Sequence, residues 1–342
     1  MKTEDFYYRL PGSLIAQKPS DLRDHSRMMV VDREKGSVEL RHFYEIAEFF
    51  EKGDTLVIND SRVIPARLFG TKSTGATIEI LLLAKHGAPE RWDVLLRPAK
   101  RVRIGTEISF NDGTSALVVE RRSEKKWILD FHTKDDFDLF LKRNGRAPLP
   151  PYIKRKKDGG NNDLDQERYQ TVCAKMPGSV AAPTAGLHFS EEILEKLEKR
   201  GVDIVRVTLH VGYGTFLPIE TANIEDHTME EESYEVSTEA AEKIGKAQRI
   251  TATGTTSVRV LESATDPEGM VRSGSGHTDL FIYPGYDFKK VNRLITNFHL
   301  PQSSLFLLTC AFGGKELIEK AYKIAVEEGF RFYSYGDCML IV

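Results

Sequence analysis

Five segments rich in small and polar residues each follow an apolar, strand-like run of the sequence. They are residues 59–67 (NDSRVIPAR), 178–189 (GSVAAPTAGLHF), 209–216 (LHVGYGTF), 253–259 (TGTTSVR) and 296–305 (TNFHLPQSSL). Open α/β sheets bind ligands at the carboxyl ends of their strands. We therefore expect these five segments to carry the chemistry of the chain.

Three histidines lie at the ends of strand-like runs or in loops, close to glycine or proline: His188, His210 and His299. Such a position suits a general acid or base that titrates near neutral pH. A hydrogen-bonded structural role is the competing interpretation for each of them. A metal site is not predicted, because the histidines have neither HxH nor HExxH spacing.

The segment TGTTSVR predicts an anion or ribose site. A strand is expected to reach Gly254, after which Thr255, Thr256 and Ser257 open a helix. Free N–H groups and the positive end of the helix dipole can hold an anion there, and Arg259 adds a cation. Ordinary helix capping explains the same residue types equally well.

Two further groups of residues are weaker candidates. Gly212 and Gly214 permit close approach of the backbone to a ligand, but they lack the third glycine and acidic partner of a dinucleotide fingerprint. Near the C-terminus, Tyr333, Tyr335 and Asp337 include rings that can stack on a base. Turn formation and hydrophobic packing are the respective alternatives.

The first element that must position these residues is a β-rich module. Between residues 63 and 133, six short strand-like runs are separated by turn residues and by no helix, which favours a small barrel or sandwich. Residues 135–145 have helical spacing and end at Gly145, so a helix is expected to close the module. Residues 148–163 are rich in Pro, Gly and charge and predict a linker or exposed loop.

The remainder of the chain predicts a layered α/β domain. Helical and strand-like segments alternate after residue 163, with Ser190 as a helix cap and the C-terminal MLIV run as a closing strand. The strand expected at residues 55–60 has no similar neighbours nearby. We therefore predict that the β module is inserted into one α/β domain, with residues 1–62 and 150–342 in the α/β domain and 63–149 in the β module.

Composition limits the classes of protein that remain. With 342 residues, the chain exceeds the roughly 250 to 300 residues of a single core, so more than one domain is expected. The balance of 40% hydrophobic and 29% charged residues excludes wholesale disorder. Three separated cysteines without CxxC spacing suggest neither a disulfide framework nor a thiolate zinc site. The start lacks signal-peptide features and no run could span a membrane, so a cytoplasmic protein is expected.

Charge is polarised along the chain although the net charge is only −3. Residues 142–157 contain seven basic residues and no acidic one: Lys142, Arg143, Arg146, Lys154, Arg155, Lys156 and Lys157. A nucleic-acid backbone is the natural partner of such a patch, and a solvated basic loop is the alternative. Residues 220–242 contain nine acidic residues and no Lys or Arg, so that part should repel phosphates.

Taken together, these motifs resemble the S-adenosylmethionine:tRNA ribosyltransferase-isomerases of queuosine biosynthesis, essentially from end to end. Besides the five segments above, the resemblance rests on LIAQ (14–17), VIPARLFG (63–70), PLPPYI (148–153), YQTV (169–172), YPGY (283–286) and YSYGD (333–337). Several of these strings are long and unusual, so chance agreement is excluded for practical purposes.

The resemblance implies an enzyme that moves the ribosyl group of S-adenosylmethionine onto 7-aminomethyl-7-deazaguanine at the tRNA wobble position. Epoxyqueuosine forms, while adenine and methionine leave. S-adenosylmethionine is consumed as the ribosyl donor, so no cofactor is expected, and the family suggests a monomer. The implied fold is α/β: an αβα layered sandwich with a small inserted six-stranded antiparallel β-barrel.

Site residues follow as hypotheses from the resemblance and the motifs. We expect the acid or base among His188, His210 and His299, with Arg259 beside them. Phe189 and Phe216 are expected to stack on adenine. The other expected substrate-binding residues are Asp60, Arg62, Thr184, Gly186, Gly212, Gly214, Thr255, Thr256, Ser257, Asn297, Tyr335 and Asp337.

One departure from the family pattern is visible. Members commonly read D-H-x-M-H-x-E, whereas residues 226–232 of this chain read DHTMEEE, with Glu230 in the place of the second histidine. No catalytic role is therefore assigned to position 230. Three other classes compete: a methyltransferase, although the early strand with a GxGxG loop is missing; a non-catalytic RNA-binding protein; and a metal-dependent hydrolase that uses the histidines.

Overall fold

The central strand of the α/β part owes its position to a continuous apolar run. In the computed structural model, which describes residues 1–88, 90–134, 136–155 and 162–342, β3 (Asp54–Asn59) is buried along its whole length. It pairs in parallel with β12 (Asp203–Leu209) through Val57 and Val205, and with β14 (Arg249–Thr253) on its other side. Strands buried on both faces are rich in Val, Ile and Leu for this reason.

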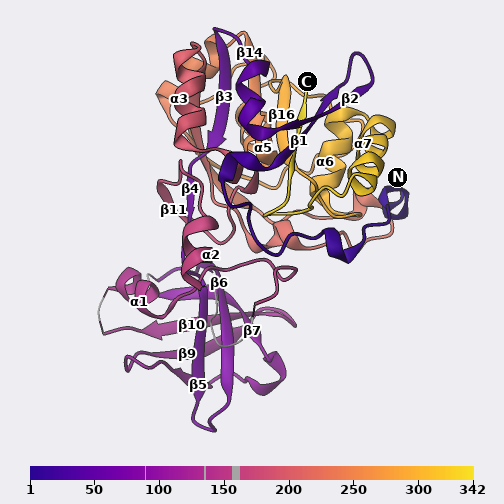
Figure 1. Ribbon diagram of the computed structural model, residues 1–342. Helices are drawn as coiled ribbons and strands as arrows, with labels where there is room; N and C mark the ends of the chain where they lie inside the picture. Colours follow the sequence, from indigo (N-terminus) through magenta and orange to yellow (C-terminus); the bar gives the residue numbers. More distant parts are fainter. Residues whose placement is uncertain (89, 135, 156–161) are drawn as a thin grey trace.

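Nine strands form the main sheet in the order β15-β13-β12-β3-β14-β16-β17-β1-β2 (Figure 1). The strands not yet bounded are β1 (Arg27–Asp32), β2 (Ser37–His42), β13 (Glu232–Val236), β15 (Gly274–Thr278), β16 (Arg293–Asn297) and β17 (Cys338–Ile341). β17 is the predicted C-terminal strand, and it lies parallel to β1 and antiparallel to β16. That prediction is confirmed.

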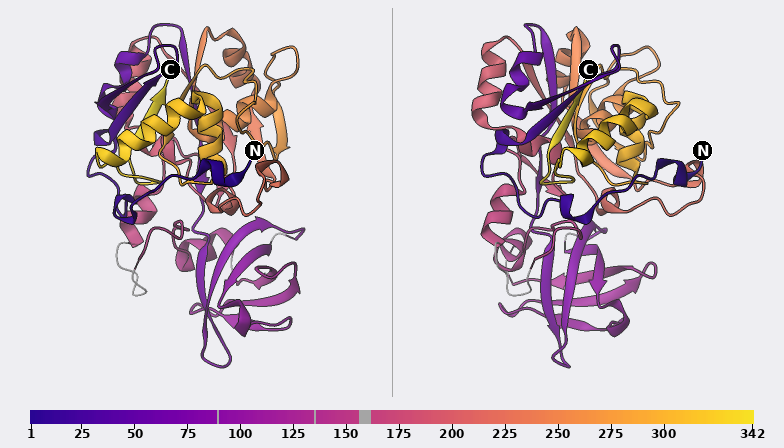
Figure 2. Two further views of the ribbon diagram at one scale, coloured as in Figure 1. Left: turned by 90° about the vertical axis from the view of Figure 1, so that its right-hand side faces the viewer. Right: turned by 45° about the vertical axis from the view of Figure 1, so that its right-hand side comes forward.

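Helices cover both faces of the sheet, as the predicted αβα sandwich requires. Val57 faces a core shared with four helices, α4 (Thr238–Lys246), α5 (Gly254–Ala264), α6 (Ser304–Gly313) and α7 (Lys315–Glu327). Leu56 and Ile58 face the opposite core, with α3 (Glu191–Lys199) and the 3-10 segment η4 (Phe43–Phe49). Figure 2 shows the sheet between α3 on one side and the yellow helices α6 and α7 on the other.

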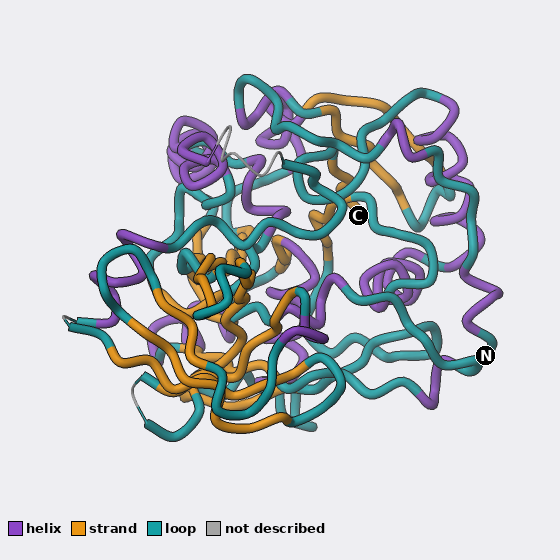
Figure 3. The backbone as a smooth tube through the Cα atoms, turned by 90° about the horizontal axis from the view of Figure 1, so that it is seen from below, coloured by secondary structure: helices purple, strands orange, loops and turns teal. Residues whose placement is uncertain are grey.

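The six strand-like runs after residue 63 form a closed antiparallel barrel in the order β10-β7-β6-β5-β8-β9, shown from below in Figure 3. The strands are β5 (Arg67–Lys72), β6 (Thr77–Lys85), β7 (Arg91–Arg97), β8 (Glu107–Ser109), β9 (Ser115–Arg121) and β10 (Lys126–His132). Alternate residues point inward and fill the interior. The predicted helix is α1 (Phe137–Asn144), whose Phe137 and Phe140 pack into this core. The fold class is confirmed.

The chain enters and leaves the barrel beside one short two-stranded sheet. β4 (Ser61–Val63) follows β3 directly and pairs in parallel with β11 (Met176–Ser179) on the return path, after α2 (Asn162–Arg168). The elements are thus arranged as an insertion after β3. The exact residue boundaries expected for the two domains stay a prediction.

Part of the expected exposed linker is buried, which corrects the sequence-based prediction for residues 148–155. Leu149 and Ile153 pack with Tyr169 and Tyr335 in a small core of their own. The prolines of PLPPYI favour a loop, but the apolar side chains of this motif are buried against the two tyrosines. Residues 156–161 lie outside the described part of the chain. No described helix has the length and apolar character needed to cross a membrane.

Candidate active site

A pocket opens where β14 and β16 end at the same edge of the sheet. Five residues predicted from the sequence line it: Thr184, Thr255, Thr256, Asn297 and His299. Other segments contribute Tyr152, Thr215, Tyr333 and Ser334. The expectation that polar segments at strand ends would converge is met for these residues.

The floor of the pocket is the start of α5. Gly254 has a φ of +82°, which allows the chain to turn sharply from β14 into the helix. Thr255 and Thr256 then line the pocket, and the Thr256 hydroxyl has no hydrogen-bond partner among the described residues. Ser257 is different, because its hydroxyl donates to the Thr253 carbonyl at 2.7 Å within the helix. Two of the three expected hydroxyl-bearing residues therefore line the pocket.

Asn297, the last residue of β16, joins several segments. Its Nδ2 donates to His188 Nε2 at 3.0 Å, and its Oδ1 accepts from the Thr184 hydroxyl at 2.9 Å. His188 Nδ1 lies 2.7 Å from the Ser26 hydroxyl. His188 and Asn297 are buried, so this chain of hydrogen bonds is shielded from water.

Burial keeps two of the three candidate histidines neutral. It lowers the pKa of His188 to about 3, and the nearby cations Arg331 and Arg23 act in the same direction. Burial alone lowers the pKa of His299 to about 3, with Nε2 of that ring 2.8 Å from the Thr296 hydroxyl. Neither imidazole is protonated at neutral pH, so neither can serve as a resting general acid.

His210 has a different environment. It is half-buried after β12, and its Nδ1 has no hydrogen-bond partner among the described residues. Burial lowers the pKa of His210, while Asp60 and Glu235 oppose the shift. The ring packs against Gly178, where a Cβ atom would come within 2.7 Å of Nδ1. The next residue, Val211, lines the pocket described above.

Asp60 and Arg62 are not brought to this pocket. Asp60 is buried at the end of β3 and accepts a hydrogen bond from the Thr208 hydroxyl at 2.7 Å. Burial raises the pKa of its carboxyl group, and the Thr208 hydrogen bond opposes the rise. Asp60 lines a separate pocket with Lys175 and Arg206, and Arg62 is exposed on β4.

Arg259 is engaged elsewhere. Its guanidinium forms an ion pair with the carboxylate of Glu232 and donates to the carbonyls of Leu280 and Thr278, each at 3.1 Å. Both partners of the ion pair are buried. The structure therefore places Arg259 as a link between α5, β13 and the end of β15 rather than in the pocket. Glu232 was not predicted as a partner of Arg259, although it occupies the final position of the family pattern D-H-x-M-H-x-E.

Two carboxylates lie directly beside the glycine-containing segment 212–216. The Gly212 N–H donates to Glu232 at 2.6 Å, and a Cβ atom at Gly214 would lie 2.9 Å from Glu230 Oε2. Glu230 also forms an ion pair with Lys126 of the barrel strand β10. Phe216 ends the 3-10 segment η7 (Tyr213–Phe216).

Two other expected contact residues belong to the core. Phe189 is 1% exposed and packs edge-on against Phe43, with 4.8 Å between the ring centroids. Gly186 is buried in η6 (Thr184–His188), where a Cβ atom would approach Thr171 to 2.9 Å. Neither lines the pocket, because each is enclosed by neighbouring side chains.

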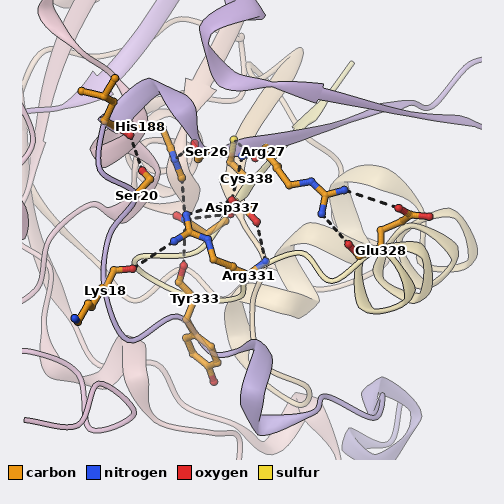
Figure 4. Close-up of polar contacts among 12 residues, drawn as sticks. Lys18, Ser20, Ser26, Arg27, His188, Glu328, Arg331, Tyr333, Asp337 and Cys338 are labelled. Carbon is orange, nitrogen blue, oxygen red and sulfur yellow. Dashed lines mark hydrogen bonds and ion pairs between the residues drawn. The ribbon is translucent and has the colours of Figure 1, made fainter.

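The C-terminal YSYGD segment divides its residues between pocket and core. Tyr335 donates to Asp165 at 3.1 Å in the core, and Asp337 accepts from the backbone N–H groups of Arg27 and Arg331 (Figure 4). Tyr333 faces the pocket instead, with its ring centroid 4.0 Å from that of Tyr152. Sequence reasoning missed Tyr152 as a pocket residue, although its PLPPYI motif was a signal.

Comparison with known proteins agrees with the arrangement of these motifs. The family model described as "Queuosine biosynthesis protein" matches residues 3–341. The chain belongs to this family. A relative from Syntrophus aciditrophicus, named S-adenosylmethionine:tRNA ribosyltransferase-isomerase, is 56% identical with both chains fully covered.

Other members of the queuosine biosynthesis protein family are similar along their whole length. Proteins of the same name from Acetivibrio thermocellus and Geobacter metallireducens are 50% and 49% identical, again with full coverage of both chains. The crystal structure of an S-adenosylmethionine tRNA ribosyltransferase from Thermotoga maritima is 37% identical. It covers 99% of this chain and 100% of its own, with a TM-score of 0.55.

In this family member, the basic residues of 142–155 differ in their surroundings. Lys142 and Arg143 are exposed on α1, and Lys154 is exposed beyond the buried PLPPYI segment. Arg146 lies over the ring of Phe69, and Arg155 forms two hydrogen bonds of 2.6 and 2.8 Å with the buried Asp165. Lys156 and Lys157 lie outside the described residues.

Metal coordination finds no support in the described part of the chain. No group of three or more His, Cys, Asp or Glu side chains there is arranged to hold a metal ion. The three candidate histidines take part in hydrogen bonding or packing with different neighbours, as described above.

Proposed function

We propose that this chain is an S-adenosylmethionine:tRNA ribosyltransferase-isomerase. It transfers and isomerises the ribosyl group of S-adenosylmethionine onto 7-aminomethyl-7-deazaguanine at the tRNA wobble position, giving epoxyqueuosine-tRNA, adenine and methionine. The observation that carries the proposal is the end-to-end identity of 56% with a relative of that name. The polar pocket at the ends of β14 and β16 supplies a place for the ribosyl donor.

His210 is the candidate base. The sulfonium of S-adenosylmethionine makes the adjacent 5′ carbon acidic and methionine a good leaving group, so a base beside that carbon can start the transfer. A general base must be neutral before it accepts a proton, and burial favours the neutral form of His210. His210 does not itself line the pocket, but it directly precedes the pocket residue Val211, so the assignment requires the substrate to reach past Val211.

The aromatic pair Tyr152 and Tyr333 is the candidate wall for adenine. Both side chains line the pocket, whereas Phe189 is enclosed in the core. The first turn of α5, with Thr255 and Thr256, offers N–H groups and hydroxyls to the carboxylate or ribose of the donor. The exposed cations Lys142, Arg143 and Lys154 are the candidates for contact with tRNA phosphates.

The test is a reaction of purified protein with S-adenosylmethionine and an anticodon stem-loop that carries 7-aminomethyl-7-deazaguanine. Free adenine together with a ribosyl-derived gain in RNA mass would support the proposal. S-adenosylhomocysteine with a methyl-sized gain would indicate a methyltransferase instead. RNA binding without consumption of S-adenosylmethionine would indicate a non-catalytic RNA-binding protein.

We further propose that the enzyme acts in the cytoplasm as a monomer and needs no metal or cofactor. Light scattering after size-exclusion chromatography tests the oligomeric state against the chain mass of 38.7 kDa. Turnover that survives treatment with a chelator supports the proposal on metals. Turnover lost to the chelator and restored by a divalent ion would contradict it.

A further inference from the structure

The orientation of the Asn297 amide is fixed by acceptors that cannot donate. Its Nδ2 lies 3.3 Å from the carbonyl oxygen of Tyr333 and 3.5 Å from that of Asp337. A carbonyl oxygen only accepts hydrogen bonds, so the NH₂ group must be on this side of the amide. The side-chain oxygen of Asn297 is thereby turned toward Thr184.

The tautomer of His188 follows from the amide orientation. The NH₂ group of Asn297 only donates, so His188 Nε2, which lies 3.0 Å away, must accept and carry no hydrogen. A neutral imidazole then has its hydrogen on Nδ1, and this atom donates to the Ser26 hydroxyl at 2.7 Å. His188 holds the amide in place and presents no proton to the pocket.

The direction of the Thr184 hydrogen bond follows in the same way. The Asn297 side-chain oxygen only accepts, so the Thr184 hydroxyl uses its hydrogen to donate to it at 2.9 Å. The Thr184 oxygen then has only its lone pairs left for a ligand. Thr184 lines the pocket. The pocket therefore contains a hydroxyl that can accept a hydrogen bond from a ligand but cannot donate one.

We propose that Ser26, His188 and Asn297 are positioning residues that fix Thr184 as the acceptor for an N–H or O–H group of S-adenosylmethionine. The inference rests on the proposed function and changes the role expected for His188, from acid or base to support of a binding group. The donor of that hydrogen bond is a ribose hydroxyl, the α-ammonium group or the adenine 6-amino group, since these are the N–H and O–H groups of this substrate.

The first arm of the test compares Thr184→Val with Thr184→Ser. Valine keeps the shape and removes the acceptor, so KM for S-adenosylmethionine should rise about tenfold, the effect of one hydrogen bond. Serine should restore most of the affinity, and KM for the RNA should stay near the wild-type value in both variants. An unchanged KM for S-adenosylmethionine in Thr184→Val would overturn the proposal.

Analogues of S-adenosylmethionine identify the donor group. One analogue lacks the 2′ hydroxyl, one lacks the 3′ hydroxyl, one lacks the α-amino group and one lacks the adenine 6-amino group. Wild-type enzyme should discriminate against the analogue without the donor, and Thr184→Val should lose that discrimination about tenfold, since the acceptor is already gone. Equal discrimination by both enzymes for all four analogues would contradict a contact between Thr184 and this substrate.

The second arm separates positioning from acid–base catalysis at His188. His188→Gln can still offer an acceptor to the Asn297 NH₂ group, whereas His188→Ala cannot. We expect Ala to raise KM for S-adenosylmethionine about as much as Thr184→Val does, and Gln to recover most of this loss. The double variant His188→Ala with Thr184→Val should be no worse than Thr184→Val alone, because both act through one hydrogen bond.

Loss of kcat to the same low level in the Gln and Ala variants would overturn the positioning role and return His188 to acid–base chemistry. Additive losses in the double variant would also overturn it. Circular dichroism and thermal melting select variants that are folded, and the Ser and Gln replacements provide the measurement if Val or Ala fails to fold. Adenine release by the wild-type enzyme tests the proposed function separately, so the two can fail independently.

Discussion

At the scale of single residues, burial decides which candidates can serve as a resting general acid. His188 and His299 were equally attractive from the sequence, because both follow strands and lie near glycine or proline. Inside the folded chain, the low pKa of about 3 keeps both rings neutral over the whole physiological range. Only their folded environment distinguishes them from His210.

These two histidines should make the protein sensitive to mild acid. In the unfolded chain each titrates near pH 6.5, and in the folded chain only near 3, so below pH 6.5 the unfolded state binds more protons. This contribution to stability is complete above pH 6.5 and is lost as the pH falls. We expect up to about 1.4 kcal/mol per pH unit for each histidine.

Urea unfolding at pH 7, 6 and 5 measures this slope. His188→Gln removes one titrating ring and should reduce the slope over this interval. A variant with the wild-type slope would show that His188 is not kept neutral in the folded protein.

The Arg259–Glu232 ion pair should contribute to the stability of the fold rather than to substrate binding. Replacing Arg259 with Met leaves a buried carboxylate without its cation and should lower the free energy of unfolding by about 3 to 5 kcal/mol. The double variant Arg259→Met with Glu232→Gln should recover part of this loss, since it removes the lone charge. Denaturation at neutral pH checks both values, and equal losses in the single and double variants would contradict this account.

Placement at the pocket could be predicted for residues that lie at a strand end, but not for residues whose partners come from distant segments. Thr255 and Asn297 line the pocket, and each directly follows or ends an apolar run. The position of Arg259 away from the pocket was not predicted, because its partner Glu232 lies 27 positions away, on a strand that no local pattern connects to α5. The burial of Phe189 was not predicted, because an aromatic residue after a loop fits a core and a binding wall equally well.

At the scale of elements, a glycine in β11 leaves space for the side chain of the candidate base, which follows β12. Gly178 has a φ of +145° in β11, and His210 fills the space that a side chain there would need. Gly201, after α3, also has a positive φ, but its neighbour is the flexible side chain of Lys52. Both glycines therefore have a positive φ, but a side chain would displace His210 only at Gly178.

We expect Gly178→Ala to lower kcat/KM by about tenfold to a hundredfold, because a displaced His210 loses its alignment. Gly201→Ala should reduce stability through backbone strain and leave kcat/KM within about twofold of wild type, since Lys52 can move aside. Steady-state kinetics below the melting temperature of both variants check this. Equal kcat/KM values in the two variants would exclude a role for His210 in the reaction.

Strand positions were easier to predict than packing between segments. The six barrel strands follow from short strand-like runs separated by turn residues, which depend only on neighbouring residues. The burial of Leu149 and Ile153 depends instead on Tyr169 and Tyr335, which come from later parts of the chain. Local composition therefore favours an exposed loop, whereas tertiary contacts bury part of this segment.

At the scale of the whole molecule, charge should guide tRNA to the side that carries α1. Lys142 and Lys154 are exposed on the basic stretch, whereas Lys243 lies just after the acidic segment and pairs with Glu239. Replacing both Lys142 and Lys154 with Glu should weaken tRNA binding. The slope of the log–log salt dependence should become shallower by about one for each phosphate that a lysine no longer neutralises.

Lys243→Glu is the matched control for this charge reversal. It introduces one such Lys-to-Glu change at a surface that is not expected to touch RNA, so its affinity and salt dependence should follow the wild type. Fluorescence anisotropy of a labelled anticodon stem-loop at several salt concentrations gives both quantities. If both variants follow the wild type, the tRNA must bind to another surface.

The place of β17 in the sheet separates two steps of folding during synthesis. This strand lies between β16 and β1 although it is far from β1 in the sequence, and Met28 pairs with Cys338. The barrel closes from neighbouring segments, and β1 can pair with the adjacent β2 early, but the other edge of β1 must wait for β17. Until β17 has been synthesised, the nascent protein therefore has a completed barrel beside an open sheet, and it needs protection at that apolar edge.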